Sequence, residues 1–229
     1  MHKPPVAQPS HAHRLLNLLA DYGALKSPGE LPCFGERLSR LFGLGDTMKL
    51  DAATAHRARP TGFAQPAAVD RLTAELANTR KALIRRIQSF TETLDTGTEP
   101  DPETALNAWL ALQRKVASSS RQLRDKVRND MKDQGHSMAR LAQLDAVFDH
   151  TMAGYTSQCF AQIPRLLEQQ FRSLQTPSDA SPDTGTAPDN RLLCYCEKAQ
   201  NLLLAELDVR LEPVLGLLEA CHNEVNHSP

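Results

Sequence analysis

The sequence predicts an all-α protein, an elongated bundle of three to four long helices preceded by a small N-terminal helical module. Between Val69 and Val225, apolar residues recur three and four positions apart along four long stretches, which is the spacing of one helix face. The alternation of apolar and polar residues that marks a strand appears nowhere over a comparable length. Each stretch is roughly 25–35 residues long, against a mean of about 12 for globular helices, so the helices should pack lengthwise as in bundles and coiled coils.

The N-terminal region predicts a tail and a small module. Residues 1–9 hold three prolines and few apolar side chains, so we expect a disordered tail. Residues 10–57 carry short apolar groups at helical spacing, at Leu15–Leu19 and at Phe34–Phe42. Asp46 has the residue type of an N-cap for a third short helix. We therefore expect residues 10–57 to form a small helical module.

The long helices have recognisable ends. Pro66 and Pro102 each follow a candidate N-cap and predict the starts of the first two long helices. Gly135 predicts a tight turn between the second and third, which makes those two antiparallel neighbours. We expect residues 67–175 to form a three-helix bundle, with kinks or breaks at Pro164 and, in the last helix, at Pro213.

The third stretch has the most regular apolar stripe, formed by Leu141, Leu144, Phe148, Met152, Tyr155, Cys159, Ile163 and Leu166. Residues 176–190 contain no bulky apolar side chain, which predicts a disordered linker. Residues 191–226 then predict a C-terminal long helix that packs on the bundle through its own stripe.

Composition favours a cytoplasmic protein. The formal net charge is −1, the N-terminus lacks the apolar run of a signal peptide, and no segment approaches the roughly 18 apolar residues of a membrane span. We expect no membrane insertion. The five cysteines lie mostly on or beside the apolar stripes, so in a reducing compartment we expect buried thiols that pack as small apolar groups.

Three constellations suggest chemistry, and each has a simpler interpretation. Glu219 and His222 have the spacing of di-iron ligands, but no second Glu-x-x-His is present, which favours a solvated helix end. Cys194 and Cys196 point about 200° apart on a helix, which disfavours a shared metal ion. Asp145 and Asp149 could act as an acid–base pair, although flanking charges between helices are more common. We therefore expect no enzyme and no catalytic, cofactor-binding or metal site.

Charge is unevenly distributed along the chain. Seven cations lie between Arg114 and Lys132, and we single out a charged interaction surface formed by Arg114, Lys115, Arg121, Arg124 and Arg128. The last helix is acidic instead. One interpretation is a basic groove for nucleic acid. The other is that these charges select which helices pair, and the acidic last helix in the same chain favours it.

Four blocks of the sequence resemble a known family. Residues 34–39 (Phe-Gly-Glu-Arg-Leu-Ser), 46–50, 141–147 and 205–217 are similar, in order and spacing, to a proteobacterial family of uncharacterised proteins, domain of unknown function 3348. Leu44-Gly45 departs from the aromatic residue expected there. The resemblance implies a bacterial helical protein without an established activity. It also implies a link to an envelope-associated complex, because members are encoded near outer-membrane envelope proteins.

These observations favour a non-enzymatic protein-binding or scaffold component that acts through helix–helix contacts, either with a protein partner or by self-association as a dimer. The alternative is a nucleic-acid-associated bundle that uses the basic stretch 114–132. The candidate docking motif comprises Phe34, Glu36, Arg37, Leu38 and Asp46. The opposing interpretation is that Phe34, Leu38 and Phe42 only cap one end of the bundle.

Overall fold

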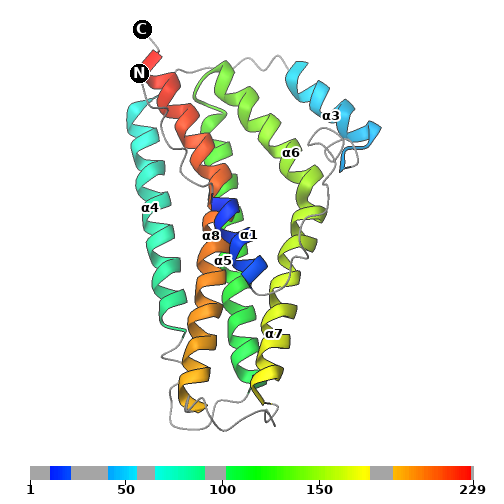
Figure 1. Cartoon of the computed structure of the whole chain (residues 1–229). Coiled ribbons are helices and arrows are strands. Elements are labelled where there is room, and N and C mark those ends of the chain that lie inside the picture. The colour runs from blue at the N-terminus through cyan, green and yellow to red at the C-terminus, as the bar shows by residue number, and fades with distance from the viewer. Residues whose placement is uncertain (1–10, 22–40, 56–64, 91–101, 176–187, 228–229) are drawn as a thin grey trace, which may run out of the picture.

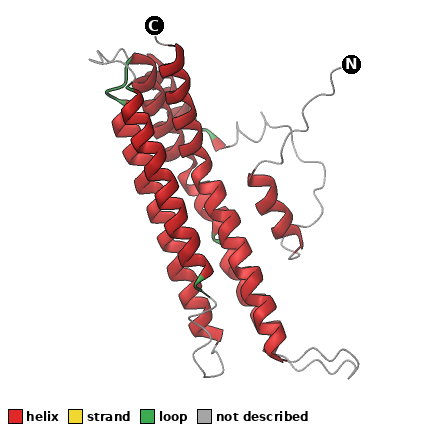
Figure 2. Cartoon of the chain, turned by 90° about the vertical axis from the view of Figure 1, so that its left-hand side faces the viewer, coloured by secondary structure: helices red, strands yellow, loops and turns green. Residues whose placement is uncertain are grey.

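The computed structural model describes residues 11–21, 41–55, 65–90, 102–175 and 188–227. Helices account for almost all of these residues, and none of them forms a strand (Figure 2), so the prediction of an all-α protein is confirmed. The helices are α1 (His11–Asp21), α3 (Leu44–Ala55), α4 (Pro66–Gln88), α5 (Pro102–Met131), α6 (His136–Phe160), α7 (Gln162–Gln175) and α8 (Pro188–His227).

The long helices run side by side (Figure 1). The C-terminal helix α8 is the centre of the arrangement, because it packs against α1, α4, α5, α6 and α7. Helix α4 packs against α5 and α8 on one side, and α6 followed by α7 lies on the other side. The last helix is thus the common packing partner of all the other described helices except α3.

The helix starts at Pro66 and Pro102 lie where the sequence predicts them. Gly135, between α5 and α6, has φ 105°, a backbone conformation that glycine adopts without steric cost. The side chain of the preceding Gln134 accepts a hydrogen bond of 2.6 Å from the backbone N–H of Gln65. The tight turn that reverses the chain therefore also binds the residue that precedes α4.

The two internal prolines behave differently from each other. The third long stretch is broken at Ala161 into α6 and α7, and Pro164 lies in the first turn of α7, where its missing N–H has no intrahelical partner to lose. Helix α8 instead continues through Pro213. The predicted break near Pro164 is confirmed, whereas the chain is not broken at Pro213. The described part of residues 67–175 consequently contains four helices rather than three.

The predicted linker boundary and the predicted N-terminal module both need correction. Helix α8 begins at Pro188, so residues 188–190, assigned to the linker, are helical; residues 176–187 lie outside the described residues, as do residues 1–10. Helix α1 packs against α8, whereas α3 packs against α6. The two described helices of the predicted N-terminal module thus lie at different places on the bundle (Figure 1).

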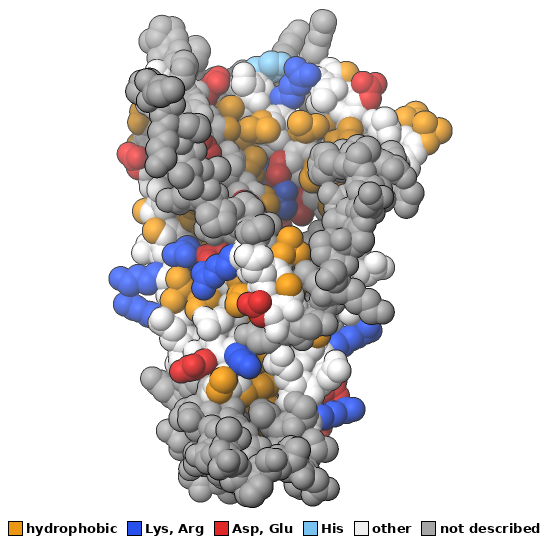
Figure 3. Space-filling model, viewed as in Figure 1, with side chains coloured by type: hydrophobic (Ala, Val, Ile, Leu, Met, Phe, Trp, Pro, Cys, Tyr) orange, Lys and Arg blue, Asp and Glu red, His pale blue; other side chains and the backbone are white. Residues whose placement is uncertain are grey.

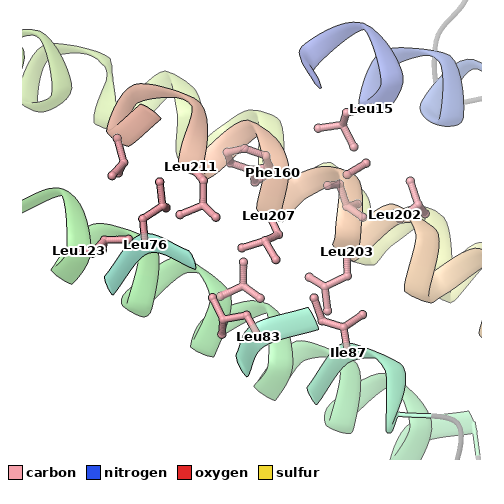
Figure 4. Close-up of a cluster of buried hydrophobic side chains, with 14 of the residues drawn as sticks. Leu15, Leu76, Leu83, Ile87, Leu123, Phe160, Leu202, Leu203, Leu207 and Leu211 are labelled. Atoms are coloured by element: carbon pink, nitrogen blue, oxygen red, sulfur yellow. The ribbon is translucent and has the colours of Figure 1, made fainter. Parts of the chain in front are cut away.

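The hydrophobic core consists mostly of aliphatic side chains and lies along α8 (Figure 4). Leu203, Leu207 and Leu211 of α8 meet side chains from α4 and α5, and Phe160 and Leu15 complete the cluster on the other side of α8. The single tryptophan, Trp109 of α5, is buried and donates its indole N–H to the carbonyl oxygen of Ala199 at 3.0 Å. That bond satisfies the only polar group on the largest core side chain.

The most regular apolar stripe is not the buried face of α6. Of its eight residues only Ile163, which lies in α7, is buried, and Phe148, Tyr155 and Cys159 are exposed. The buried side chains of α6 are Met138, Ala142 and Phe160. The expectation that the stripe faces the core is wrong for α6, because α6 turns a face that carries charged residues towards α5.

Candidate functional site

The predicted docking motif is described only at its C-terminal end. Phe34, Glu36, Arg37 and Leu38 lie outside the described residues, as does the family block 34–39. Asp46 lies in the first turn of α3. The candidate site is therefore built from α3 and the helix against which it packs.

Asp46 stabilises the start of α3. Its Oδ2 atom accepts a hydrogen bond of 3.2 Å from the backbone N–H of Gly43, and the hydroxyl of Thr47 donates to the carbonyl oxygen of Gly43 at 3.1 Å. This is the acidic half of a capping box, with the acid at the third helical position. The expectation that Asp46 is the N-cap is wrong by three residues, because the helix starts at Leu44 and Gly43 precedes it.

Two contacts attach α3 to α6. The aromatic rings of Phe42 and Phe148 lie 5.6 Å apart, and the hydroxyl of Thr151 donates to Oδ1 of Asp46 at 3.5 Å. Ala53 of α3 is also buried. Phe42 thus packs against the bundle, and the carboxylate of Asp46 is directed towards α6 and its own helix.

The exposed face of α3 carries two large apolar side chains together with the charged side chain of Asp51. Leu44 is 81% exposed and Met48 is 65% exposed, and these two side chains are one helical turn apart. They are the two most exposed large apolar side chains among the described residues. A helix that presents apolar side chains one turn apart has the form of the helical ligands that dock in apolar grooves.

Two arginines of the predicted charged surface form ion pairs between helices. Arg124 and Arg128, one turn apart on α5, face Asp145 and Asp149, one turn apart on α6. Arg124 binds both oxygens of Asp145, at 2.9 and 2.6 Å, and one oxygen of Asp149 at 2.6 Å. Arg128 contacts the same two carboxylates at 2.6 and 2.7 Å. We call these four residues the α5–α6 ion cluster.

Burial and the neighbouring arginine charges shift the pKa of Asp145 in opposite directions. Desolvation by burial raises the pKa of Asp145, while the hydrogen bonds and charges of Arg124 and Arg128 lower it, and the net pKa lies below the ordinary value of 3.8. A carboxylate held ionised between two guanidinium groups has no proton to donate near neutral pH. The arrangement of Asp145 and Asp149 therefore fits helix pairing rather than acid–base chemistry.

The five residues of the predicted charged surface do not share one face. Arg124 and Arg128 lie within the α5–α6 ion cluster. Arg114, Lys115 and Arg121 are exposed. Arg121 lies two turns before Arg128, on that side of α5, whereas Lys115 lies three turns before Lys126, which pairs with α4. The exposed members are thus divided between two flanks of the helix.

The acidic residues Glu206 and Asp208 of α8 have partners that lie outside the basic stretch 114–132. Glu206, fully buried, accepts hydrogen bonds from Gln113 at 2.8 Å and from Arg210 at 2.8 Å. The guanidinium carbon of Arg210 lies 3.9 Å from the ring centroid of Phe160, the last residue of α6. This network joins α5, α6 and α8 next to the break between α6 and α7. Burial, opposed by Arg210 and Gln113, raises the pKa of Glu206 above its ordinary value of 4.5.

Asp208 of α8 forms ion pairs with two other helices. Its carboxylate lies 2.9 Å from a guanidinium nitrogen of Arg80 on α4 and 3.6 Å from one of Arg14 on α1. Arg124 and Arg128 of the basic stretch pair with α6 and not with α8. Charge does connect the helices, but the predicted pairing of the basic stretch with the acidic last helix is wrong for its two least exposed arginines.

A known protein family covers nearly the whole chain. Residues 1–223 match the family described as Protein of unknown function (DUF3348). The chain belongs to this family. No curated protein and no solved structure matches it.

The four cysteines that the structure describes in this family member are free thiols in two environments. Cys196 and Cys221 are buried, and burial raises the pKa of each thiol to about 11. Cys159 and Cys194 are exposed. The expectation of buried thiols therefore holds for two of the four. Cys194 and Cys196 differ in burial, as their spacing on a helix requires.

Of the remaining candidates, His222 has a structural partner. The ring nitrogen Nε2 of His222 lies 3.2 Å from the hydroxyl of Thr73, so this histidine links α8 to α4. Within the described part of the chain, no three His, Cys, Asp or Glu side chains gather in a way that could hold a metal ion. None of the described helices has an apolar stretch long enough to cross a membrane.

Glu206 and Gln113 are the polar residues that the sequence argument missed. Glu206 interrupts the apolar run Leu202–Leu207, and an acid within such a run signals a buried carboxylate that needs partners. Gln113 has no comparable signal, because a glutamine next to the charged pair Arg114 and Lys115 predicts a solvated position. Its role depends on Glu206, which lies 93 residues later in the chain.

Proposed function

We propose that this protein is a non-enzymatic scaffold that binds a partner protein through helix–helix contacts, with the outward face of α3 as its docking surface. The observation that carries the proposal is the exposure of Leu44 and Met48 on one face of a short helix. Burying two such side chains against a partner would contribute roughly 1.5–3 kcal/mol each. The elongated bundle of long helices would serve as the rigid support for that surface.

The attachment of α3 to the bundle supports this role. Phe42 and Asp46 hold the helix on α6, so its outward side chains have a defined direction before a partner arrives. A preorganised helix loses less conformational entropy on binding than a segment that folds on contact. The envelope-associated complex that the family resemblance implies is the first place to seek the partner.

The charge arrangement favours a protein partner over nucleic acid. A polyanion on the stretch 114–132 would have to meet the cations that remain outside the α5–α6 ion cluster, and these lie on two flanks of α5. Each phosphate that a cation neutralises adds to the affinity for a duplex, so cations divided between two flanks offer fewer contacts to one duplex. Association of the unmodified protein with DNA that weakens steeply as salt is added would favour nucleic acid instead.

Site-specific photocrosslinking in cells of the native host tests the proposal. We expect a photoreactive phenylalanine analogue at position 48 to give a discrete crosslinked band, and Leu44→Glu in the same chain to abolish it. Position 215, an exposed leucine on α8, provides the matched control and should give no band. A product of twice the chain mass would identify the partner as a second copy. Absence of a band at position 48, or an equal band at position 215, would refute the docking role of α3.

A further inference from the structure

A shallow groove follows one flank of α4. Its floor is formed by Leu76, Ala77 and Ile84. The opposite flank of the helix is already occupied, because Arg71 and Glu75 pair with α5. The groove therefore lies on the side of α4 that turns away from α5.

The contacts of α4 with α8 place the groove beside their junction. Towards the start of the groove, the Thr73 hydroxyl lies 3.2 Å from Nε2 of His222. Towards its end, the side chain of Gln200 donates to the carbonyl oxygen of Gln88 at 3.1 Å. Thr73 and Gln88 are four turns apart, or roughly 22 Å at 1.5 Å per residue. That length suits a helix of about four turns.

The rim of the groove is strongly basic. The C-terminal half of α4, from Leu76 to Gln88, carries four cations and no acid, namely Arg80, Lys81, Arg85 and Arg86. Arg80 shares Asp208 with Arg14, whereas Lys81 and Arg85 have no carboxylate within ion-pair distance among the described residues. Figure 3 shows Lys and Arg side chains gathered on this side of the molecule, over α4.

The electrostatics of the helix account for only part of this excess. Arg85 and Arg86 lie in the last turn of α4, where cations interact favourably with the partial negative charge of the helix end. Lys81 lies outside that turn, and the helix end does not explain an apolar floor between the cations.

We propose that this flank of α4 binds an acidic amphipathic helix of a partner protein. The apolar side of that helix fills the floor formed by Leu76, Ala77 and Ile84, and its carboxylates meet Lys81 and Arg85. A nucleic acid would leave the apolar floor unused, and α4 has no aromatic side chain on which a base could stack. The inference goes beyond the proposed docking role of α3, because α3 and α4 lie on opposite sides of the bundle (Figure 1).

Fluorescence anisotropy with defined probes tests the proposal on the full chain. The first probe is a 16-residue peptide rich in Glu and Leu, with Leu at helical spacing; the second has the same composition in scrambled order; the third is a DNA duplex. We expect the parent protein to bind only the first. Lys81→Glu with Arg85→Glu should weaken that binding at least about tenfold, as the reversal of two rim charges implies.

Matched variants separate a local effect from a general one. Arg140→Glu with Arg165→Glu makes the same change in charge at exposed positions of α6 and α7, and should leave peptide affinity unchanged. Lys81→Gln with Arg85→Gln removes the charges without adding acids at the helix end and should also weaken binding. Leu44→Glu should have no effect, so failure at α3 and failure at α4 are distinguishable. No binding of the first peptide, equal binding of the scrambled peptide, tighter binding of DNA, or an equal loss in the control would each overturn the proposal.

Discussion

Arg124 of α5 binds both carboxylate oxygens of Asp145 on α6, at 2.9 and 2.6 Å. The bidentate geometry fixes the axial alignment of the two helices as well as their lateral contact. A shift of one turn would place Arg124 opposite Asp149 alone. Arg128, one turn further along α5, binds one oxygen of Asp145 at 2.6 Å and one oxygen of Asp149 at 2.7 Å.

Removal of one cluster arginine should destabilise the protein far more than removal of an exposed arginine on the same helix. Arg128 is 9% exposed, and Arg128→Ala would leave Asp145 with only one of its two cations. We expect a loss of about 2–4 kcal/mol in the free energy of unfolding. Arg121→Ala, the control, should change it by less than about 0.5 kcal/mol. Urea denaturation followed by circular dichroism measures both, and equal losses would contradict the assigned role of the cluster.

The cluster should also make stability depend on acidity. The pKa of Asp145 is lower in the folded protein than its ordinary value of 3.8, so its stabilising effect is fully present above that pH and is lost as the pH falls below about 4. Asp145→Asn removes the titrating group. The difference in unfolding free energy between parent and variant should therefore be large at pH 7 and shrink at pH 3. A difference that is constant between these two pH values would show that Asp145 is not held by charge.

Glu206 should show the opposite dependence. Its pKa is raised in the folded protein, so its contribution is most favourable below the ordinary value of 4.5 and declines as the pH rises through the folded pKa. Glu206→Gln keeps the size of the side chain and removes the charge. We expect the stability of this variant relative to the parent to increase from pH 4.5 to pH 7.5. A relative stability that decreases over this range would mean that Arg210 and Gln113 outweigh the cost of burial.

The described cysteines should react with thiol reagents at two rates. Cys159 and Cys194 are exposed, whereas Cys196 and Cys221 are buried and have thiol pKa values of about 11. Alkylation of the native protein at pH 8, followed by peptide mass spectrometry, should modify the first pair within minutes and the second only after unfolding. Modification of Cys196 as rapid as that of Cys194 would contradict the packing of α8.

The helices and most of their ends could be predicted from local features of the amino-acid sequence. Pro66, Pro102 and Gly135 act through the backbone of a few neighbouring residues, so their effect can be predicted without knowledge of the rest of the chain. The period of the apolar residues likewise distinguishes helix from strand locally. The family resemblance could be read from short blocks for the same reason, and the match over residues 1–223 confirms it.

Which helix faces and which charged residues meet depends on how the helices pack, and local sequence features do not reveal it. The stripe through Phe148 and Tyr155 predicts the buried side of α6, yet the bundle buries Met138 and Ala142 instead, because Asp145 must reach the arginines of α5. Periodicity reports that a helix has an apolar face but not which neighbour covers it. The partners of α8 were equally inaccessible, since Gln113 and Glu206 lie 93 residues apart and meet only when the helices pack. The energy of such contacts depends on burial, which packing alone creates.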